Sequence, residues 1–129
     1  MKQLQYPFDA EEILKKKKAI RRELLSAPDK EFIEKRIAIL GGFTTSNIRL
    51  ILELFLLNQG IRPSFYESEY NQYYQDAVFP GAELMEFAPD VIYVCTCNRN
   101  IVAYPKLTDS EKQVEALLDN EEQKLTMVW

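Results

Sequence analysis

Three short apolar segments, each bounded by glycine or proline, constrain the fold of this chain more than any other feature. They cover residues 36–40, 64–67 and 91–96, and helix-like stretches separate them. Segments this short, bordered by turn residues, are typical of buried strands rather than of core helices. Strands joined by helical crossovers favour a parallel sheet with helices on both faces.

Five helices are expected around these strands, over residues 8–27, 48–58, 70–77, 83–87 and 109–127. Asp9 and Glu12 form a capping-box pattern at the first, which Pro28 should end. Thr108 or Asp109 is the expected cap of the last helix. Right-handed crossovers are expected, and in a flavodoxin-type order the first strand is central, which gives a sheet ordered 2-1-3. The predicted fold is a flavodoxin-like three-layer α/β sandwich.

Composition excludes several kinds of chemistry. The 129 residues carry a net charge of −4 and include no histidine and two cysteines. Histidine triads and histidine metal sites are therefore excluded, and Cys95 with Cys97 supplies half a metal site at best. No apolar run is long enough to cross a bilayer, and the acidic balance disfavours nucleic acid. We expect a cytoplasmic protein with no cofactor of its own.

The sheet order also predicts where a ligand would bind. Open α/β sheets bind ligands beyond the carboxyl ends of their strands, where the winding reverses. Here the loops after the first and third strands should meet, combining a helix N-terminus with an arginine, and both favour anions. We predict an oxyanion pocket built from Gly41, Gly42, Thr44, Thr45, Asn98, Arg99 and Asn100, with Tyr66 and Glu67 on its rim.

Ordinary structural roles fit the same residues. The glycines and threonines also suit a tight strand-to-helix turn with Thr44 as the cap, and Arg99 also suits a clamp on a backbone carbonyl. The basic run at 15–22 suits a solvated helix face or an acidic partner. The tyrosines and phenylalanines of residues 65–79 suit packing at a sheet edge or a partner surface.

Several stretches resemble the N-terminal domain of FkbH-like proteins, which belong to subfamily IIIC of the haloacid-dehalogenase (HAD) superfamily. They are residues 36–45 (RIAILGGFTT), 53–61 (ELFLLNQGI), 63–76 (PSFYESEYNQYYQD), 87–90 (FAPD) and 98–101 (NRNI). The resemblance covers nearly the whole chain, and residues 66–73 are its most specific part. It implies an SGNH-hydrolase fold followed by a HAD catalytic domain. Family members are phosphatase-like, and some load a glyceryl unit onto an acyl carrier protein.

The chain departs from the hydrolase pattern where that pattern needs its reactive groups. The nucleophile block after the first strand corresponds to Gly41, Gly42 and Phe43, and phenylalanine has no nucleophilic atom. The late histidine base is missing, and the asparagine block corresponds to Asn98 or Asn100. Thr44 is the nearby hydroxyl that could substitute. No Asp-x-Asp motif of the HAD type occurs, so a magnesium site would belong to a separate HAD domain.

These observations predict a non-catalytic accessory domain. Residues 1–35 would form a helical extension, and residues 36–129 the first part of a larger FkbH-like protein, because flavodoxin-like sheets have about five strands. Its partners would be a HAD domain, an acyl carrier protein or a small anionic ligand. One alternative is a weak esterase or acyltransferase using Thr44. Another is an assembly module that dimerises through an open sheet edge and the surface of residues 66–74.

Overall fold

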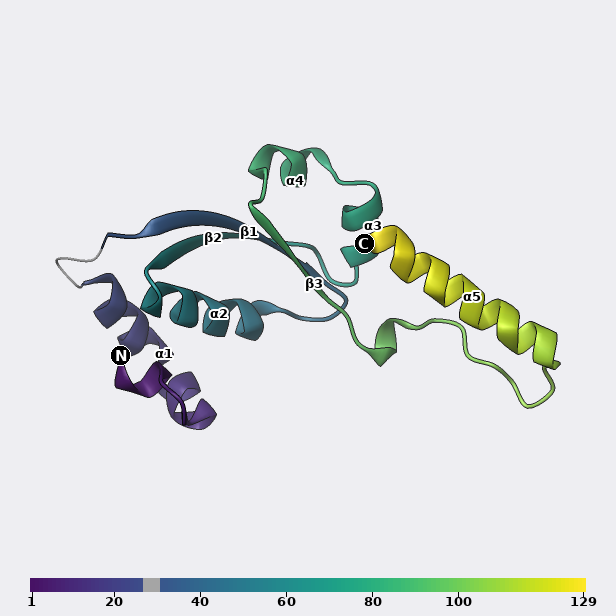
Figure 1. Cartoon of the computed structure of the whole chain (residues 1–129), viewed down its shortest axis with the longest axis horizontal. Helices are drawn as coiled ribbons and strands as arrows, with labels where there is room; N and C mark the ends of the chain where they lie inside the picture. The colour runs from purple at the N-terminus through teal and green to yellow at the C-terminus, as the bar shows by residue number, and fades with distance from the viewer. Residues whose placement is uncertain (27–30) are drawn as a thin grey trace.

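The computed structural model describes residues 1–26 and 31–129, and strands alternate with helices along it (Figure 1). The elements are η1 (Lys2–Leu4), α1 (Ala10–Leu25), β1 (Ile33–Gly41), α2 (Ser46–Asn58), β2 (Ile61–Glu67), α3 (Tyr73–Val78), α4 (Ala82–Phe87), β3 (Val91–Cys95), η2 (Asn98–Asn100) and α5 (Glu111–Val128). Asp9 caps α1 by accepting the backbone N–H groups of Glu11 and Glu12, as expected. The predicted stop at Pro28 lies outside the described residues.

The three strands form a parallel sheet in the order β2-β1-β3, which confirms the predicted topology. Ile37 of β1 is level with Phe65 of β2 and with Val91 of β3. The central strand is buried from Ile37 to Gly41, and Ile39 is completely inaccessible to solvent. An uninterrupted apolar run is what a parallel strand needs when helices cover both of its faces.

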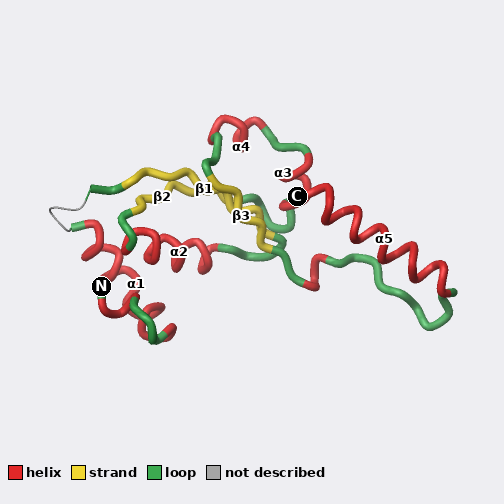
Figure 2. Tube along the Cα trace, viewed as in Figure 1, coloured by secondary structure: helices red, strands yellow, loops and turns green. Residues whose placement is uncertain are grey.

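Helices cover the two faces of the sheet from opposite sides (Figure 2). On one face α2 packs against β2, and α1 packs on α2 through a cluster that includes Ile13, Leu24 and Leu54. On the other face Ala38 and Leu40 of β1 contact α3 and α4. This alternation follows from the two-residue period of a strand and gives the three layers that the sequence predicts.

Several element boundaries differ from the predictions by two or three residues, among them the start of β1 at Ile33 rather than at residue 36. The strand expected from residue 64 begins at Ile61 and contains Pro63. Proline has no backbone N–H to donate, and an edge strand tolerates this because groups on its outer side have no partner strand. The helix expected from residue 70 begins at Tyr73, because Asn71 adopts a left-handed conformation with φ of 60°. Ser110, rather than Thr108 or Asp109, caps α5 through a capping box with Gln113.

Helix α5 extends away from the rest of the molecule and buries none of its residues (Figure 1). Its last turn returns to the body, where Tyr74 donates a hydrogen bond to the sulfur of Met127 at 3.4 Å. Lys124 lies 6.0 Å from the ring of Tyr73. The helix is therefore anchored mainly by its C-terminal end.

The packing of α2 gives a stability prediction. Leu54 is fully buried among α1, α2 and η1, so Leu54→Ala should lower the free energy of unfolding by about 2–5 kcal/mol. Leu118→Ala removes the same atoms from an exposed position on α5 and should change it by less than about 0.5 kcal/mol. Urea denaturation measures both values. Equal losses in the two variants would contradict this assignment of the core.

Candidate functional site

The loops that follow β1 and β3 meet at the carboxyl end of the sheet, as the topology predicts. The backbone N–H of Gly42 donates to the carbonyl of Cys95 at 2.8 Å, which joins the ends of the two strands. Beside this bond lies Asn100, which is the last residue of η2 and is buried. The sequence thus places the polar residues of both loops correctly at one end of the sheet.

Asn100 uses its whole side-chain amide to hold neighbouring loops. Its Nδ2 donates to the carbonyl of Gly42 at 2.7 Å and to Oδ1 of Asn71 at 3.1 Å. Its Oδ1 accepts the backbone N–H of Cys97 at 2.8 Å. We call these four residues the Asn100 clamp. Because both amide hydrogens are engaged, the Asn100 side chain holds the fold together and has no donor left for a ligand.

Gly42 is required by this close approach. A Cβ atom added at Gly42 would overlap the side-chain amide of Asn100. At Gly41 an added Cβ would lie 2.5 Å from Cγ2 of Thr45 and 2.9 Å from the carbonyl oxygen of Phe43. The pair of glycines therefore lets the loop after β1 pack tightly under η2 and the start of α2.

Thr45 and Glu67 also come together, and with Arg49 they form a partly exposed polar group. The Thr45 hydroxyl donates to Oε2 of Glu67 at 2.9 Å, and Nε of Arg49 lies 2.7 Å from Oε1 of the same carboxylate. Thr45 is buried, and it occupies the N-cap position of α2 without capping the helix through its side chain. The prediction that Thr44 caps this helix is therefore wrong.

Three of the predicted pocket residues face solvent at this end of the molecule. Thr44, Asn98 and Arg99 are exposed. Within residues 1–26 and 31–129, the Arg99 side chain makes no hydrogen bond or ion pair, so the expected clamp on a backbone carbonyl does not form. Lys124 of α5 contributes a cation that the sequence did not predict, since its Nζ donates to the carbonyl of Asn100 at 3.2 Å.

Tyr66 lies on the opposite face of the sheet from its neighbour Glu67. Its hydroxyl donates to Oδ2 of Asp76 at 3.1 Å, and its ring centroid lies 6.0 Å from that of Phe87. Burial, followed by the negative charge of Asp76, raises the pKa of Tyr66 to about 12. The structure does not bring Tyr66 to the predicted pocket.

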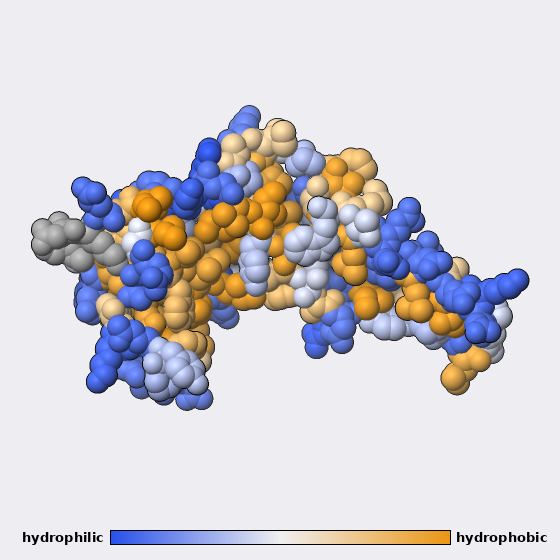
Figure 3. Space-filling model, viewed as in Figure 1, coloured by the Kyte–Doolittle hydropathy of each residue, from blue (hydrophilic) through white to orange (hydrophobic). Residues whose placement is uncertain are grey.

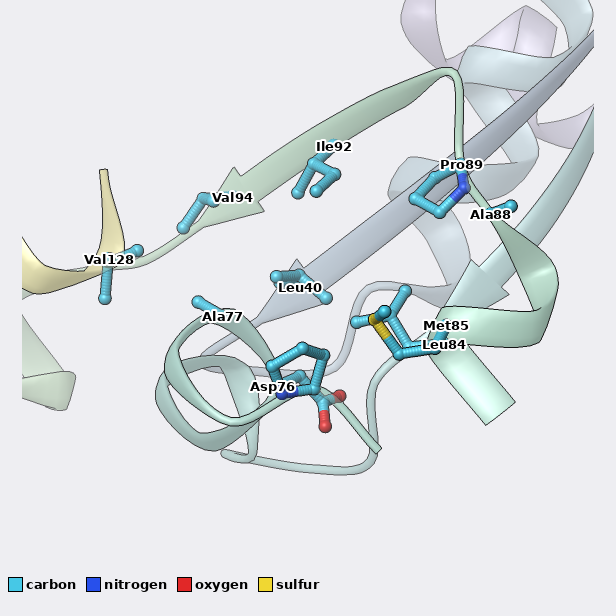
Figure 4. A pocket seen from close by; sticks show the side chains of 11 residues that line it. Leu40, Asp76, Ala77, Leu84, Met85, Ala88, Pro89, Ile92, Val94 and Val128 are labelled. Atoms are coloured by element: carbon cyan, nitrogen blue, oxygen red, sulfur yellow. The ribbon is translucent and has the colours of Figure 1, made fainter. Parts of the chain in front are cut away.

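A hollow of about 380 Å³ lies on this second face, between the sheet and the helices α3 and α4 (Figure 4). Its lining is mainly apolar, and Asp76 is the charged residue in it. Its largest apolar side chains come from four elements: Leu40, Leu84, Met85, Ile92, Val94 and Val128. This hollow is separate from the predicted oxyanion pocket, and strand periodicity indicates its β1 and β3 residues but not its depth.

The described residues contain neither a cluster of metal ligands nor a membrane-spanning helix. No three histidine, cysteine, aspartate or glutamate side chains in 1–26 and 31–129 are close enough to hold a metal ion. Cys95 and Cys97 both carry free thiols. No helix in the described part of the chain combines the length and apolar composition needed to cross a bilayer.

Comparison with known proteins supports the fold. The chain matches no protein-family model and no curated protein. It is similar to the crystal structure of the N-terminal part of the protein BF1531 from Bacteroides fragilis, which contains a phosphatase domain and is complexed with Mg. The TM-score is 0.65 at 18% identity, over 87% of this chain and 29% of that chain. The chain thus spans less than a third of its structural neighbour, and the likeness shows a shared fold.

The Asn100 clamp predicts a non-additive pair of substitutions. Gly42→Ala should cost about 1–3 kcal/mol of unfolding free energy through overlap with Asn100. Asn100→Ala should cost about 1–3 kcal/mol because it leaves buried backbone groups unpaired. The double variant should lose less than the sum, because the shortened side chain makes room for the new methyl group.

Urea denaturation of the wild type, the two single variants and the double variant measures this coupling. Gly81→Ala is the matched control, because an added Cβ there meets no atom within 4 Å and the residue has φ of −70°. It should remain close to the wild type. Strict additivity of the Gly42 and Asn100 losses would show that the contact is absent.

Tyr66 predicts a loss of stability at high pH. Its pKa is about 12 in the folded chain, against an ordinary value near 10. The folded state therefore holds the phenol proton more tightly, and this contribution is complete below about pH 10 and disappears as the pH rises towards 12. Titration of phenolate absorbance should show a late-ionising tyrosine that Tyr66→Phe removes. Tyr6→Phe alters an exposed ring and should leave the late phase intact.

Proposed function

We propose that this chain is a non-catalytic accessory domain that works beside a HAD-type phosphatase or transferase domain of FkbH-like type. The observation that best supports this proposal concerns the end of β1, where a hydrolase of this fold would present its nucleophile. Phe43 follows the two glycines there, and the nearest amide, that of Asn100, is fully engaged by Gly42, Asn71 and Cys97. The site therefore lacks both the nucleophile and a free amide donor at this position.

Thr44 does not replace the missing nucleophile in this arrangement. A hydroxyl becomes nucleophilic when an adjacent base accepts its proton. The chain has no histidine, and Thr44 makes no side-chain hydrogen bond to any residue within 1–26 and 31–129. The one carboxylate that contacts a threonine here, Glu67, is bonded to Thr45 and neutralised by Arg49. A binding role accounts for these contacts better than a weak esterase does.

The structural neighbour supports a phosphatase-type domain as the partner of this chain. A region with the same fold occurs in the crystallised N-terminal part of a protein that contains a phosphatase domain, and this chain covers 29% of that crystallised part. In the proposed assembly, the phosphatase-type domain supplies the aspartate nucleophile and binds magnesium. The present chain would position that domain, or an acyl carrier protein that delivers its substrate.

The exposed polar end of the sheet is the proposed contact with an anionic group. Arg99 is free to form paired hydrogen bonds with a phosphate or carboxylate. Lys124 adds a second cation beside the carbonyl of Asn100, and the first turn of α2 has no side-chain cap on its N–H groups. Thr44 and Asn98 complete this surface. These groups favour an oxyanion, and the FkbH-like resemblance indicates a phosphorylated carboxylic acid as the ligand to test.

The proposal predicts binding without hydrolysis. Calorimetric titration with phosphate and with phosphoglycerate should show binding that weakens about tenfold in Arg99→Ala, because the variant loses charge-assisted hydrogen bonds. Arg62→Ala is the matched control, since Arg62 pairs with Glu34 at the opposite end of the sheet. In the same buffers, p-nitrophenyl phosphate and p-nitrophenyl acetate should remain unhydrolysed.

Two results would overturn this function. Equal affinities of the wild type and Arg99→Ala, or no binding by either, would show that Arg99 and its neighbours do not form an anion-binding surface. Ester hydrolysis that disappears in Thr44→Ala would support the esterase alternative instead. Circular dichroism of each variant confirms that the fold is retained.

A further inference from the structure

Helix α1 concentrates positive charge within a chain that is acidic overall. The net charge of the chain is −4, yet six of its 16 lysines and arginines lie in this one helix, at Lys15–Lys18, Arg21 and Arg22. Figure 3 shows hydrophilic surface around the end of the molecule that carries α1, whereas hydrophobic surface gathers over the middle, where the strands lie. None of these cations belongs to the exposed polar end of the sheet that carries Arg99.

Helical periodicity brings three of these cations to one hollow. Arg21 follows Lys17 by four residues and Lys18 by three, and side chains at these spacings share one face of a helix. All three line a hollow of about 270 Å³ between α1 and α2. Lys15 and Lys16 lie on other faces of α1 and do not line it. The sequence therefore divides the basic run into a part that faces the hollow and a part that faces solvent.

The opposite wall of this hollow comes from α2 and supplies a fourth cation, Arg49. Nε of Arg49 lies 2.7 Å from Oε1 of Glu67, and Nε of Arg21 donates to Oε1 of Glu53 at 2.8 Å. Both arginine side chains are partly exposed. Among the described residues (1–26 and 31–129), neither arginine donates a hydrogen bond through its terminal Nη groups. Each guanidinium is thus held on one side by a carboxylate and keeps its outer edge available.

This arrangement orients the hollow for an oxyanion. A guanidinium binds phosphate through two parallel hydrogen bonds, and fixing its direction in advance reduces the entropy lost on binding. Lys17 and Lys18 make no ion pair with any residue in 1–26 or 31–129, so their ammonium groups are available as point charges. Four cations face two carboxylates here, which leaves a net positive charge.

The hollow lies on the β2 side of the molecule, away from Arg99. Glu67, which holds Arg49, is the last residue of β2, and β2 is the outer strand on that side of β1. Arg49 also lies 6.0 Å from the ring of Phe65 in the same strand. Arg99 follows β3, the strand on the other side of β1. The hollow is therefore separate from the surface proposed above, and further strands beside β3 would leave it unchanged.

We propose that this hollow binds the diphosphate group of a small ligand. Its volume is below the range of about 300–1,000 Å³ that drug-sized ligands occupy, so it suits a compact group rather than a helix of another protein. Cations on both walls match an anion with two charged centres, because a single carboxylate would engage one wall alone. The site does not rest on the proposed accessory function.

Removal of the two lysine charges tests the proposal. Calorimetric titration of the full chain with pyrophosphate should show binding that weakens at least tenfold in the double variant Lys17→Gln/Lys18→Gln. Sulfate at the same ionic strength should bind the wild type at least tenfold more weakly than pyrophosphate, because it presents one anionic centre. ADP carries the same group in esterified form, and its binding should depend on the same two lysines if the natural ligand is a diphosphate ester.

Lys15→Gln/Lys16→Gln is the matched control. It removes two charges from the same turn of α1 but outside the hollow, and it should bind pyrophosphate like the wild type. Arg99→Ala should also keep its affinity for pyrophosphate, which separates this site from the proposed anion surface. Circular dichroism checks the fold of each variant. If the first double variant unfolds, Lys18→Gln replaces it, because Lys18 is exposed and its loss should still weaken binding.

Three outcomes would overturn the proposal. Absence of pyrophosphate binding by the wild type would show that the hollow is a solvated part of the helix surface. Equal losses in the two double variants would show that the charge of α1 acts as a diffuse field with no defined site. A loss confined to Arg99→Ala would place the ligand at the other surface. Phosphoglycerate titration of Lys17→Gln/Lys18→Gln decides the proposed function separately.

Discussion

The contact between Asn100 and Gly42 is the interaction on which the carboxyl end of this sheet depends. It joins the loop after β1 to the turn after β3, and through Asn71 it reaches the connection between β2 and α3. Each bond links residues that are far apart in the sequence, and the side chain that makes them is buried. A glycine with no Cβ and an amide with two donors are both needed, because a larger residue or a single hydroxyl could not fill these roles.

The sheet could be predicted because its signals are local. A short apolar run followed by two glycines indicates a buried strand at residues 36–40, and the flavodoxin-type arrangement of strands and helices gives the order of the three strands. The starts of β2 and α3 are harder to predict, since the edge position of Pro63 and the left-handed conformation of Asn71 depend on tertiary neighbours. The cap at Ser110 does have a local signal, because Gln113 follows it at capping-box spacing.

The candidate site was predicted in location but not in detail. Sequence reasoning brought the two loops together, yet it assigned Thr45 and Asn100 to a ligand when both bind other parts of the protein. Their partners lie 22 and 58 residues away, and no spacing in the sequence indicates such distant hydrogen bonds. Tyr66 is different, because strand alternation alone places it on the opposite face from Glu67. Lys124 lies on α5, and the sequence does not predict where this helix packs against the sheet.

Helix α5 contributes little to the core, and this has a consequence for how the molecule unfolds. Its 18 residues include none that is buried, and its contacts with the body gather in the turns near Lys124 and Met127. Melting its first turns therefore exposes almost no additional apolar surface and breaks mainly the hydrogen bonds within the helix. The first half of α5 can therefore fray and reform while the sheet and the last turn of the helix remain folded.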